Sequence, residues 1–307
     1  MSLRFSTLIL ALGLTGCDWD DFGNSQAYKE DFHHSYPLKP GGKVTVESFN
    51  GSVEVSGWNQ DTVDVSGTKY ANSENLMNAI KIDIVADSGS VRIRTIRPSE
   101  RRGSLGARYV IKVPHKTHLD GINTSNASIR AEEIDAPARL RTSNGSIRLG
   151  KMQGAVEATT SNASIEIEDL EGPAVLKTSN GQVRAESVRG SFDATTSNAS
   201  IRARLARSEP RRPIRLETSN GSIDLTLDVL NENDVRASTS NAGITVRMPS
   251  ALNAKVRAHT SNSSISSEFD VRREGAQTKH RLDGTIGAGG PLLELGTSNG
   301  SIKLIKL

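Results

Sequence analysis

Apolar residues recur in short alternating runs along most of the chain, and each run ends at turn-forming residues. In one representative segment, Val156 and Ala158 share one parity, whereas Ile165 and Ile167 share the opposite parity. A strand keeps its apolar face only while the parity holds, so the chain must bend between these two pairs. Gly, Asp and Glu at positions 169–172 indicate a second turn. The unit therefore reads as strand, bend, strand, turn.

The bend recurs as the motif Thr-Ser-Asn followed by Gly, Ala or Ser, which we call the asparagine corner. Its asparagines are Asn126, Asn144, Asn162, Asn180, Asn198, Asn220, Asn241, Asn262 and Asn299. Successive spacings are 18, 18, 18, 18, 22, 21, 21 and 37 residues, so the last interval is expected to hold a degenerate copy or a loop. Asn50 heads an outlying earlier copy. A nearly constant period predicts a stacked repeat architecture.

Two all-β architectures obey this pattern, and the residue after the corner asparagine distinguishes them. In an antiparallel β-meander of hairpins, Asn-Gly forms a type I′ turn that needs a positive φ at both central residues. Alanine follows Asn126, Asn162, Asn198 and Asn241, and a positive φ costs a non-glycine residue about 1 kcal/mol or more. We therefore predict a single-stranded parallel β-solenoid with the asparagines in one hydrogen-bonded column. Right-handed winding is expected, because parallel crossovers are right-handed.

Large and small residues alternate at one apolar position before the corner. Leucine occupies it in the copies with Asn-Gly, and alanine occupies it in most copies with Asn-Ala, as Leu140, Ala158, Leu176 and Ala194 illustrate. Either adjacent coils interdigitate, with one unit per coil, or one coil spans two units and like stacks on like. The sequence leaves both possibilities open.

The first residues have the pattern of an exported lipoprotein. Arg4 precedes the apolar run 5–14, which is too short to span a bilayer of about 30 Å as a helix. The following Leu-Thr-Gly-Cys resembles the bacterial lipobox, in which the cysteine is lipidated and becomes the mature N-terminus. Residues 1–16 are thus expected to be a signal peptide, and Cys17 to carry the lipid that holds the protein on a membrane surface.

The segment after the cysteine is polar and lacks periodicity, so we expect residues 17–42 to form a flexible tether. Strand patterns begin at Lys43 and predict a repeat domain over 43–307. Within it, residues 43–122 form irregular N-terminal strands and 123–307 hold the repeats. Asp18 resembles an enterobacterial signal for inner-membrane retention. The expected location is the periplasmic side of the bacterial cell envelope, with the choice of membrane left open.

Composition and motifs argue against several function classes. The 38 basic and 35 acidic residues nearly balance, which argues against nucleic-acid binding. The single cysteine excludes an internal disulfide and a multi-thiolate zinc site. No catalytic motif or calcium-binding repeat occurs, so we expect no enzyme activity, no cofactor and no metal. The histidine pairs His33–His34 and His115/His118 are interpreted as solvated side chains.

The repeats resemble a bacterial adhesin family of unknown function whose domains consist of tandem T-S-N-G-S-I strands. The resemblance rests on the array itself, on the strand at 110–117, and on the closing copy at 293–302. It implies an all-β surface module with a structural or binding role and a polysaccharide or protein partner. An envelope-stress or signalling accessory and a β-helix polysaccharide-active enzyme are the alternatives. Longer units between Asn198 and Asn262 depart from the family pattern.

Overall fold

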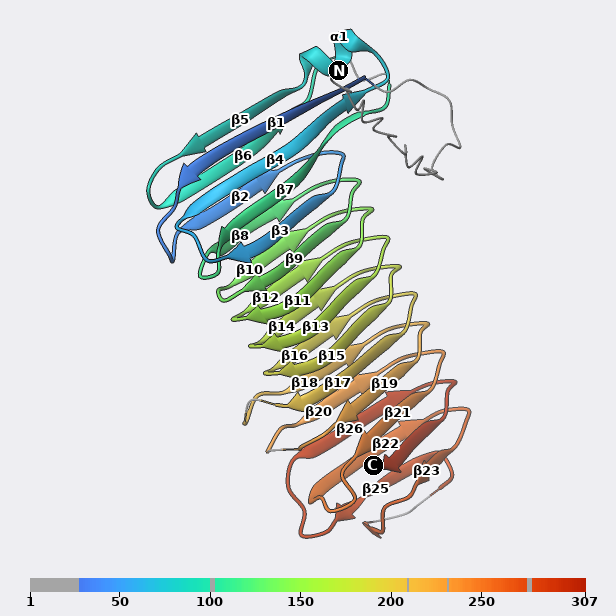
Figure 1. Ribbon diagram of the computed structural model, residues 1–307. Coiled ribbons are helices and arrows are strands. Elements are labelled where there is room, and N and C mark those ends of the chain that lie inside the picture. Colours follow the sequence, from blue (N-terminus) through green and yellow to red (C-terminus); the bar gives the residue numbers. More distant parts are fainter. Residues whose placement is uncertain (1–27, 100–102, 209, 231, 275–277) are drawn as a thin grey trace, which may run out of the picture.

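Two long β-sheets face each other along a rod, as the computed structural model shows (Figure 1). It describes residues 28–99, 103–208, 210–230, 232–274 and 278–307. Within these ranges the chain forms one 13-stranded sheet, here sheet A, and one 14-stranded sheet, here sheet B. One short helix, α1 (Glu74–Ala79), begins at the N-cap residue Ser73 and lies at the N-terminal end of the rod.

The strands of sheet A follow one another along the rod in an order that departs from chain order at both ends. In spatial order they are β1 (Tyr28–Pro37), β4 (Thr62–Ala71), β7 (Leu105–Pro114), β3 (Val53–Trp58), β9 (Ile129–Ile134), β11 (Ile147–Gln153), β13 (Ile165–Glu171), β15 (Val183–Arg189), β17 (Ile201–Arg207), β19 (Ile223–Leu227), β21 (Ile244–Met248), β27 (Ile302–Lys306) and β23 (Ile265–Ser267).

Sheet B shows the same regular centre and rearranged ends. Its strands, from the N-terminal end of the rod, are β5 (Lys81–Ala86), β6 (Ser90–Ile96), β2 (Lys43–Glu47), β8 (His118–Asn123), β10 (Ala138–Arg141), β12 (Val156–Thr159), β14 (Ala174–Lys177), β16 (Phe192–Thr195), β18 (Ile214–Glu217), β20 (Val235–Ser238), β26 (Leu292–Thr297), β22 (Ala254–Thr260), β25 (Arg281–Ile286) and β24 (Val271–Arg273).

Each repeat unit makes one coil, with one strand in each sheet joined by the asparagine corner. Ala138 pairs with Val156 in sheet B, and Ile147 pairs with Ile165 in sheet A, both in parallel and both 18 residues apart. The predicted all-β parallel solenoid is confirmed, and the antiparallel meander is wrong for the repeats. The open question of coil size is also answered, because stacked neighbours are one unit apart.

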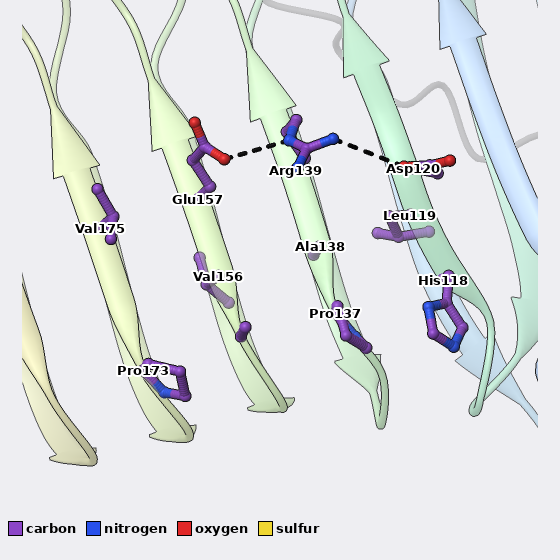
Figure 2. A pocket seen from close by; sticks show the side chains of 11 residues that line it. His118, Leu119, Asp120, Pro137, Ala138, Arg139, Val156, Glu157, Pro173 and Val175 are labelled. Carbon is purple, nitrogen blue, oxygen red and sulfur yellow. Dashed lines mark hydrogen bonds and ion pairs between the residues drawn. The ribbon is translucent and has the colours of Figure 1, made fainter. Parts of the chain in front are cut away.

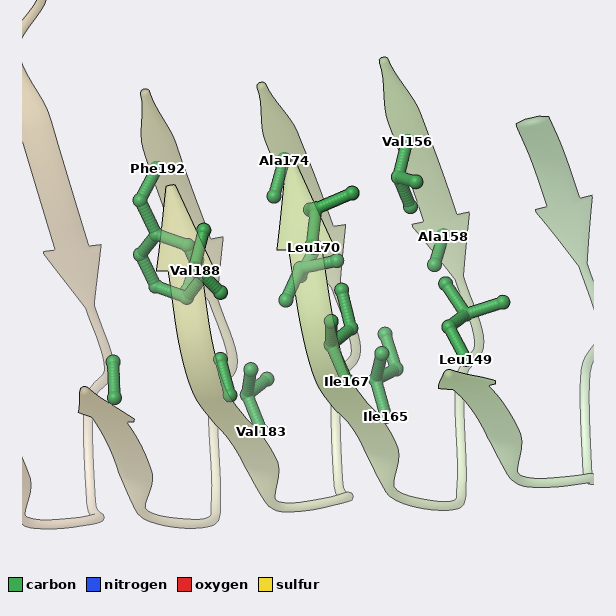
Figure 3. Close-up of a cluster of buried hydrophobic side chains, with 14 of the residues drawn as sticks. Leu149, Val156, Ala158, Ile165, Ile167, Leu170, Ala174, Val183, Val188 and Phe192 are labelled. Atoms are coloured by element: carbon green, nitrogen blue, oxygen red, sulfur yellow. The ribbon is translucent and has the colours of Figure 1, made fainter. Parts of the chain in front are cut away.

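Aliphatic side chains fill the space between the sheets in columns that run along the rod (Figure 3). Ile147, Ile165 and Val183 follow one another in sheet A and are fully buried. Facing them in sheet B, Leu140 stacks on Ala158, and Ala158 stacks on Leu176. The alternation of large and small residues thus lets neighbouring coils interdigitate in a narrow core that needs few aromatic side chains.

A bulge in sheet A was missing from the sequence interpretation. Glu133, Lys151, Asp169 and Ser187 have φ values of 60°, 50°, 59° and 56°, in the left-handed region. Each adds one residue to its strand, so the next apolar residue, such as Leu170, points inward again. The turn expected at 169–172 begins later than expected: β13 continues to Glu171, and the chain changes sheet at Gly172 and Pro173.

Both ends of the repeat array place the terminal coil one position inward. The first coil, β2–β3, lies between β6–β7 and β8–β9, although β6 and β7 come later in the chain. The last coil, β26–β27, lies between β20–β21 and β22–β23, although β22 and β23 come earlier. A terminal coil that is paired on both sides has no outermost edge from which to fray.

Large and small residues alternate between adjacent coils at the position of Leu140 and Ala158, and this rule predicts where the last coil lies. Ala237 and Ala258 occupy the alternating position in two copies that are consecutive in the chain, which breaks the rule. In space Leu295 lies between them, paired with both, and the large–small order is restored. The 37-residue interval is therefore neither a degenerate copy nor a loop, because it contains the antiparallel strands β24 and β25.

The expected tether is wrong over Tyr28–Pro37, where the chain forms β1 antiparallel to β4. Phe32 packs edge-on against Tyr109 with ring centroids 5.6 Å apart, and Leu38 is fully buried. The sequence pattern missed this strand because Phe32, His34 and Tyr36 alternate without the aliphatic residues that mark the others. Residues 1–27, which hold the expected signal peptide, Cys17 and the first part of the expected tether, lie outside the described residues.

Antiparallel strands cover the N-terminal end of both sheets and the C-terminal end of sheet B, whereas sheet A ends in the parallel strand β23. At the N-terminal end β4 pairs with β7 and β5 with β6, while at the C-terminal end β25 pairs with β22 and β24 with β25. Uncovered parallel edges of a solenoid invite association with other chains, and such caps block it.

The glycine of the asparagine corner is required by close backbone contact and not by its φ. None of Gly145, Gly181, Gly221 and Gly300 lies in the left-handed region. A Cβ at Gly181 would collide with the carbonyl oxygen of Ala163 in the adjacent coil.

Reciprocal substitutions at this contact are expected to differ in effect. Gly181→Ala should lower the free energy of unfolding by about 1–3 kcal/mol, because the added methyl overpacks the corner. Ala163→Gly leaves the contact intact and should cost about 1 kcal/mol or less. Urea denaturation of both variants tests the difference, and equal losses would contradict the contact.

Candidate binding surfaces

The corner asparagines form one continuous column on the solvent side of the rod. Each side-chain Nδ2 donates to the Oδ1 of the next asparagine toward the N-terminal end, over 2.6–2.8 Å. In spatial order the members are Asn50, Asn126, Asn144, Asn162, Asn180, Asn198, Asn220, Asn241, Asn299 and Asn262. Asn50, the outlying copy, starts the column and donates to the carbonyl of Leu105 at 2.9 Å. One amide hydrogen per residue is left for solvent or a partner.

A buried threonine ties every described corner after the one at Asn126 to a neighbouring coil. Thr178 Oγ1 donates to the carbonyl of Ala163 at 3.0 Å and accepts the N–H of Gly181 at 3.2 Å. Thr142, Thr218 and Thr297 repeat this arrangement in the other glycine copies. The Thr-Ser-Asn motif thus satisfies the backbone groups at the bend, which explains why each unit needs it.

A shallow depression lies on the outer face of sheet B, next to the turns that follow sheet A (Figure 2). Small or cyclic residues, among them Pro137, Ala155 and Pro173, form its floor. Arg139 crosses it and contacts Glu157 at 3.1 Å and Asp120 at 3.6 Å. Its volume of about 270 Å³ is below the range of about 300–1,000 Å³ for small-molecule sites. The depression is therefore too small for a typical small-molecule site and is better suited to contact with part of a larger partner.

Outer sheet A carries charged side chains in columns that cross from coil to coil. Arg148 contacts Glu166 at 3.2 Å, and Lys151 contacts Glu133 at 2.9 Å. The Lys151 hydrogen bond lowers the pKa of the Glu133 carboxyl below its ordinary value. These pairs are solvent-exposed, and water and salt screen them, so they contribute little to stability. They make sheet A a highly charged face with a regular spacing.

The histidines noted in the sequence have different surroundings. His33 Nε2 contacts Asp64 Oδ2 at 2.6 Å, and His115 Nδ1 contacts the carbonyl of Glu133 at 2.7 Å. His118 lines the sheet B depression. Over the described ranges, no group of three or more His, Cys, Asp or Glu side chains is placed to hold a metal ion. A helix suited to crossing a bilayer is likewise not found among the described residues.

The N-terminal end of the core holds one strongly perturbed phenol. Tyr109 is fully buried and shares a 2.6 Å hydrogen bond with Thr95. Burial raises the pKa of Tyr109 to about 12, partly opposed by that hydrogen bond. Because the folded pKa exceeds the ordinary value of 10.0, its contribution to stability is present below pH 10 and is lost as pH rises to about 12.

Alkaline pH is therefore expected to destabilise the protein through this residue. Between about pH 10 and pH 12 the free energy of unfolding should fall by about 2–3 kcal/mol. Tyr109→Phe should be less stable at neutral pH but show a smaller decline. Denaturation midpoints measured across this range test the claim, with Tyr28→Phe as an exposed control. An identical decline in Tyr109→Phe would refute the assignment.

The described coils and surfaces define a two-sheet parallel β-solenoid with long outer faces. The family model described as Toastrack DUF4097 matches residues 37–305, and the chain belongs to that family. The expected tandem-repeat family is thereby confirmed at the level of family and fold. No curated protein matches the chain.

Solved structures of low identity span nearly the whole chain. A candidate cell-adhesion protein from Clostridium sporogenes is 10% identical, with 91% of this chain and 100% of that chain covered and a TM-score of 0.21. A candidate adhesin from Bacteroides fragilis is 10% identical, with 91% and 97% covered and a TM-score of 0.29. One from Parabacteroides distasonis is 8% identical, with 92% and 98% covered and a TM-score of 0.30. At these TM-scores the similarity supports no functional argument.

Proposed function

We propose that the protein is a lipid-anchored, adhesin-like binding module of the bacterial cell envelope, held on the membrane through Cys17. The observation that carries the binding role is the pair of long outer faces, on which polar and charged side chains repeat at every coil. Parallel coils are spaced about 4.8 Å apart. A surface of this kind suits an extended partner, because many weak contacts at a fixed spacing add up along one molecule.

The anchoring part of the proposal is supported by the N-terminal sequence. A basic residue, an apolar run and Leu-Thr-Gly precede the single cysteine of the chain. Two or more acyl chains on one cysteine give stable membrane attachment, since each buried methylene contributes about 0.8 kcal/mol. The rod would then stand on the periplasmic side of a membrane with its N-terminal cap nearest the lipid.

Cys17→Ala tests the anchor directly. The wild-type protein should sediment with membranes and incorporate a labelled fatty acid, whereas the variant should be soluble and unlabelled. Ser25→Ala, in the same segment, serves as the matched control and should behave as wild type. The anchor proposal fails if the Cys17→Ala protein still sediments with membranes.

A further inference from the structure

One strand of sheet A presents only arginines as charged side chains. Arg202, Arg204 and Arg207 of β17 are exposed, and we call them the arginine row. Successive outward positions of a strand are about 6.6 Å apart, so the row extends over the full length of β17. The neighbouring strand β15 adds Arg184 and Arg189.

Like charges lie opposite each other at two places between these strands. Arg184 is the register partner of Arg202, and Arg189 is that of Arg207. Such pairs destabilise a sheet unless something compensates for them. Arg189 contacts Asp169 at 2.9 Å, and Arg204 contacts Asp228 at 3.2 Å.

Two members of the row lack such compensation. Arg202 and Arg207 form no ion pair with any described residue. The Asp224 carboxylate, which is the register partner of Arg202, is engaged by Arg247 at 3.3 Å instead. Among the residues that the structure describes, two guanidinium groups on one strand thus have no carboxylate partner.

The surface is hollowed at both ends of the row. Arg202 and Arg204 line one hollow together with Arg247 and Thr226, and the carboxylates there, Glu186 and Asp224, are each paired with another arginine. Arg207 lines the second with Arg189 and Glu171, beside the turns at Pro173 and Gly190. One extended ligand could therefore place an anionic group at Arg202 and another at Arg207.

We propose that the arginine row binds a linear acidic polysaccharide, whose carboxylates engage Arg202 and Arg207 as the chain lies along β17. Guanidinium forks match carboxylates with two parallel hydrogen bonds. The separation of the two arginines requires several anionic groups on one extended molecule. Strands β15, β17 and β19 carry no aromatic residue on which nucleic-acid bases stack, so a polynucleotide is disfavoured.

This inference deepens the proposed function by naming the partner class, and it rests on that function for access to envelope polymers. Its test uses purified protein and is independent of the lipid anchor. Failure of the Cys17→Ala experiment would therefore leave the polysaccharide result interpretable, and the reverse also holds.

Binding to polygalacturonate is measured at low and high salt for the wild type and for the double variant Arg202→Gln/Arg207→Gln. Neutral dextran, polyphosphate and single-stranded DNA are the comparison ligands. The matched control is Arg215→Gln/Arg236→Gln, which removes the same charge from the exposed face of sheet B. Melting temperatures verify that both variants are folded.

The wild type should bind polygalacturonate in a salt-dependent manner and dextran not at all. The double variant should bind about tenfold more weakly or worse, and the sheet B control within about twofold of wild type. Equal losses in the two variants, no binding to polygalacturonate, or tighter binding to polyphosphate or DNA would each overturn the proposal.

Discussion

Truncation of the chain after Pro291 is expected to unfold the C-terminal end of the rod, including residues that the deletion does not remove. The deleted coil, β26–β27, lies between two other coils and pairs with both. Leu293, Leu295, Ile302 and Leu304 are each at most 1% exposed. Burial of one such side chain contributes about 1.5–3 kcal/mol. Removal of these four side chains therefore costs more free energy than the remaining contacts of the end coil β22–β23 can offset.

Hydrogen exchange resolves where the truncated protein is unfolded. Amides of residues 254–286 should lose protection, while those of 147–207 should keep it, since coils contact only their neighbours. Truncation after Lys306 removes only the exposed Leu307 and should change nothing beyond that residue. Restacking of β22–β23 directly on β20–β21 would preserve protection at 254–260, and this outcome would contradict the interdigitation of large and small residues.

Ile165→Asp is expected to be the most destabilising single substitution in the central coils. Ile165 is fully buried and stacks between Ile147 and Val183 in the apolar core. A carboxylate there must either stay charged in an apolar interior or bind a proton at neutral pH. The expected loss is about 4 kcal/mol or more in the free energy of unfolding.

The neighbouring outward position supplies the control for that prediction. Glu168 directly follows the inward Ile167 and is exposed on the outer side of β13, and Glu168→Asp should change stability by less than about 0.5 kcal/mol. Urea denaturation monitored by circular dichroism measures both variants. If Ile165→Asp unfolds at the wild-type urea concentration, the inward parity of β13 is misassigned.

The sequence predicted the coil well because its two periodic signals are strong and independent. Parity change marks the bend, and the repeated asparagine marks which bend is stacked. Alanine after the corner asparagine argued against hairpins, although the glycine copies turned out to need their glycine for close backbone contact with the alanine copy of the adjacent coil, as Gly181 does with Ala163. The column itself followed from the motif, down to the outlying Asn50.

Other features depend on contacts between residues distant in the chain, which no local pattern reports. The strand at Tyr28–Pro37 forms because β4 offers it an edge, and its own aromatic and histidine residues resemble a polar linker. The bulge residues were missed because their left-handed φ values occur at ordinary residues such as Lys151 and Asp169. The leucine at position 295 indicates that the last coil lies between those of Ala237 and Ala258. This could be predicted from the sequence only if it were already known that large and small residues alternate between adjacent coils.

The binding surfaces were the least predictable part of the molecule. The basic residues of 201–207 can be seen in the sequence, but whether they form a basic surface depends on neighbouring strands. Arg184 and Arg189 lie opposite two of them, and Asp224 forms its ion pair with Arg247. These are properties of neighbouring coils 18 or more residues away. The sheet B depression likewise arises from small residues aligned across three turns.

Cysteine cross-linking tests the order of the coils most directly. In a Cys17→Ser background, Asn241→Cys is paired either with Asn299→Cys or with Asn262→Cys. Asn299 and Asn241 are joined by a 2.8 Å hydrogen bond, and adjacent coils at about 4.8 Å are within disulfide range, whereas a separation of two coils is not. A disulfide in the 241/299 protein and none in the 241/262 protein is the predicted result. A disulfide only in the 241/262 protein would show that the coils stack in chain order, and a disulfide in neither would show that the corners do not form a column.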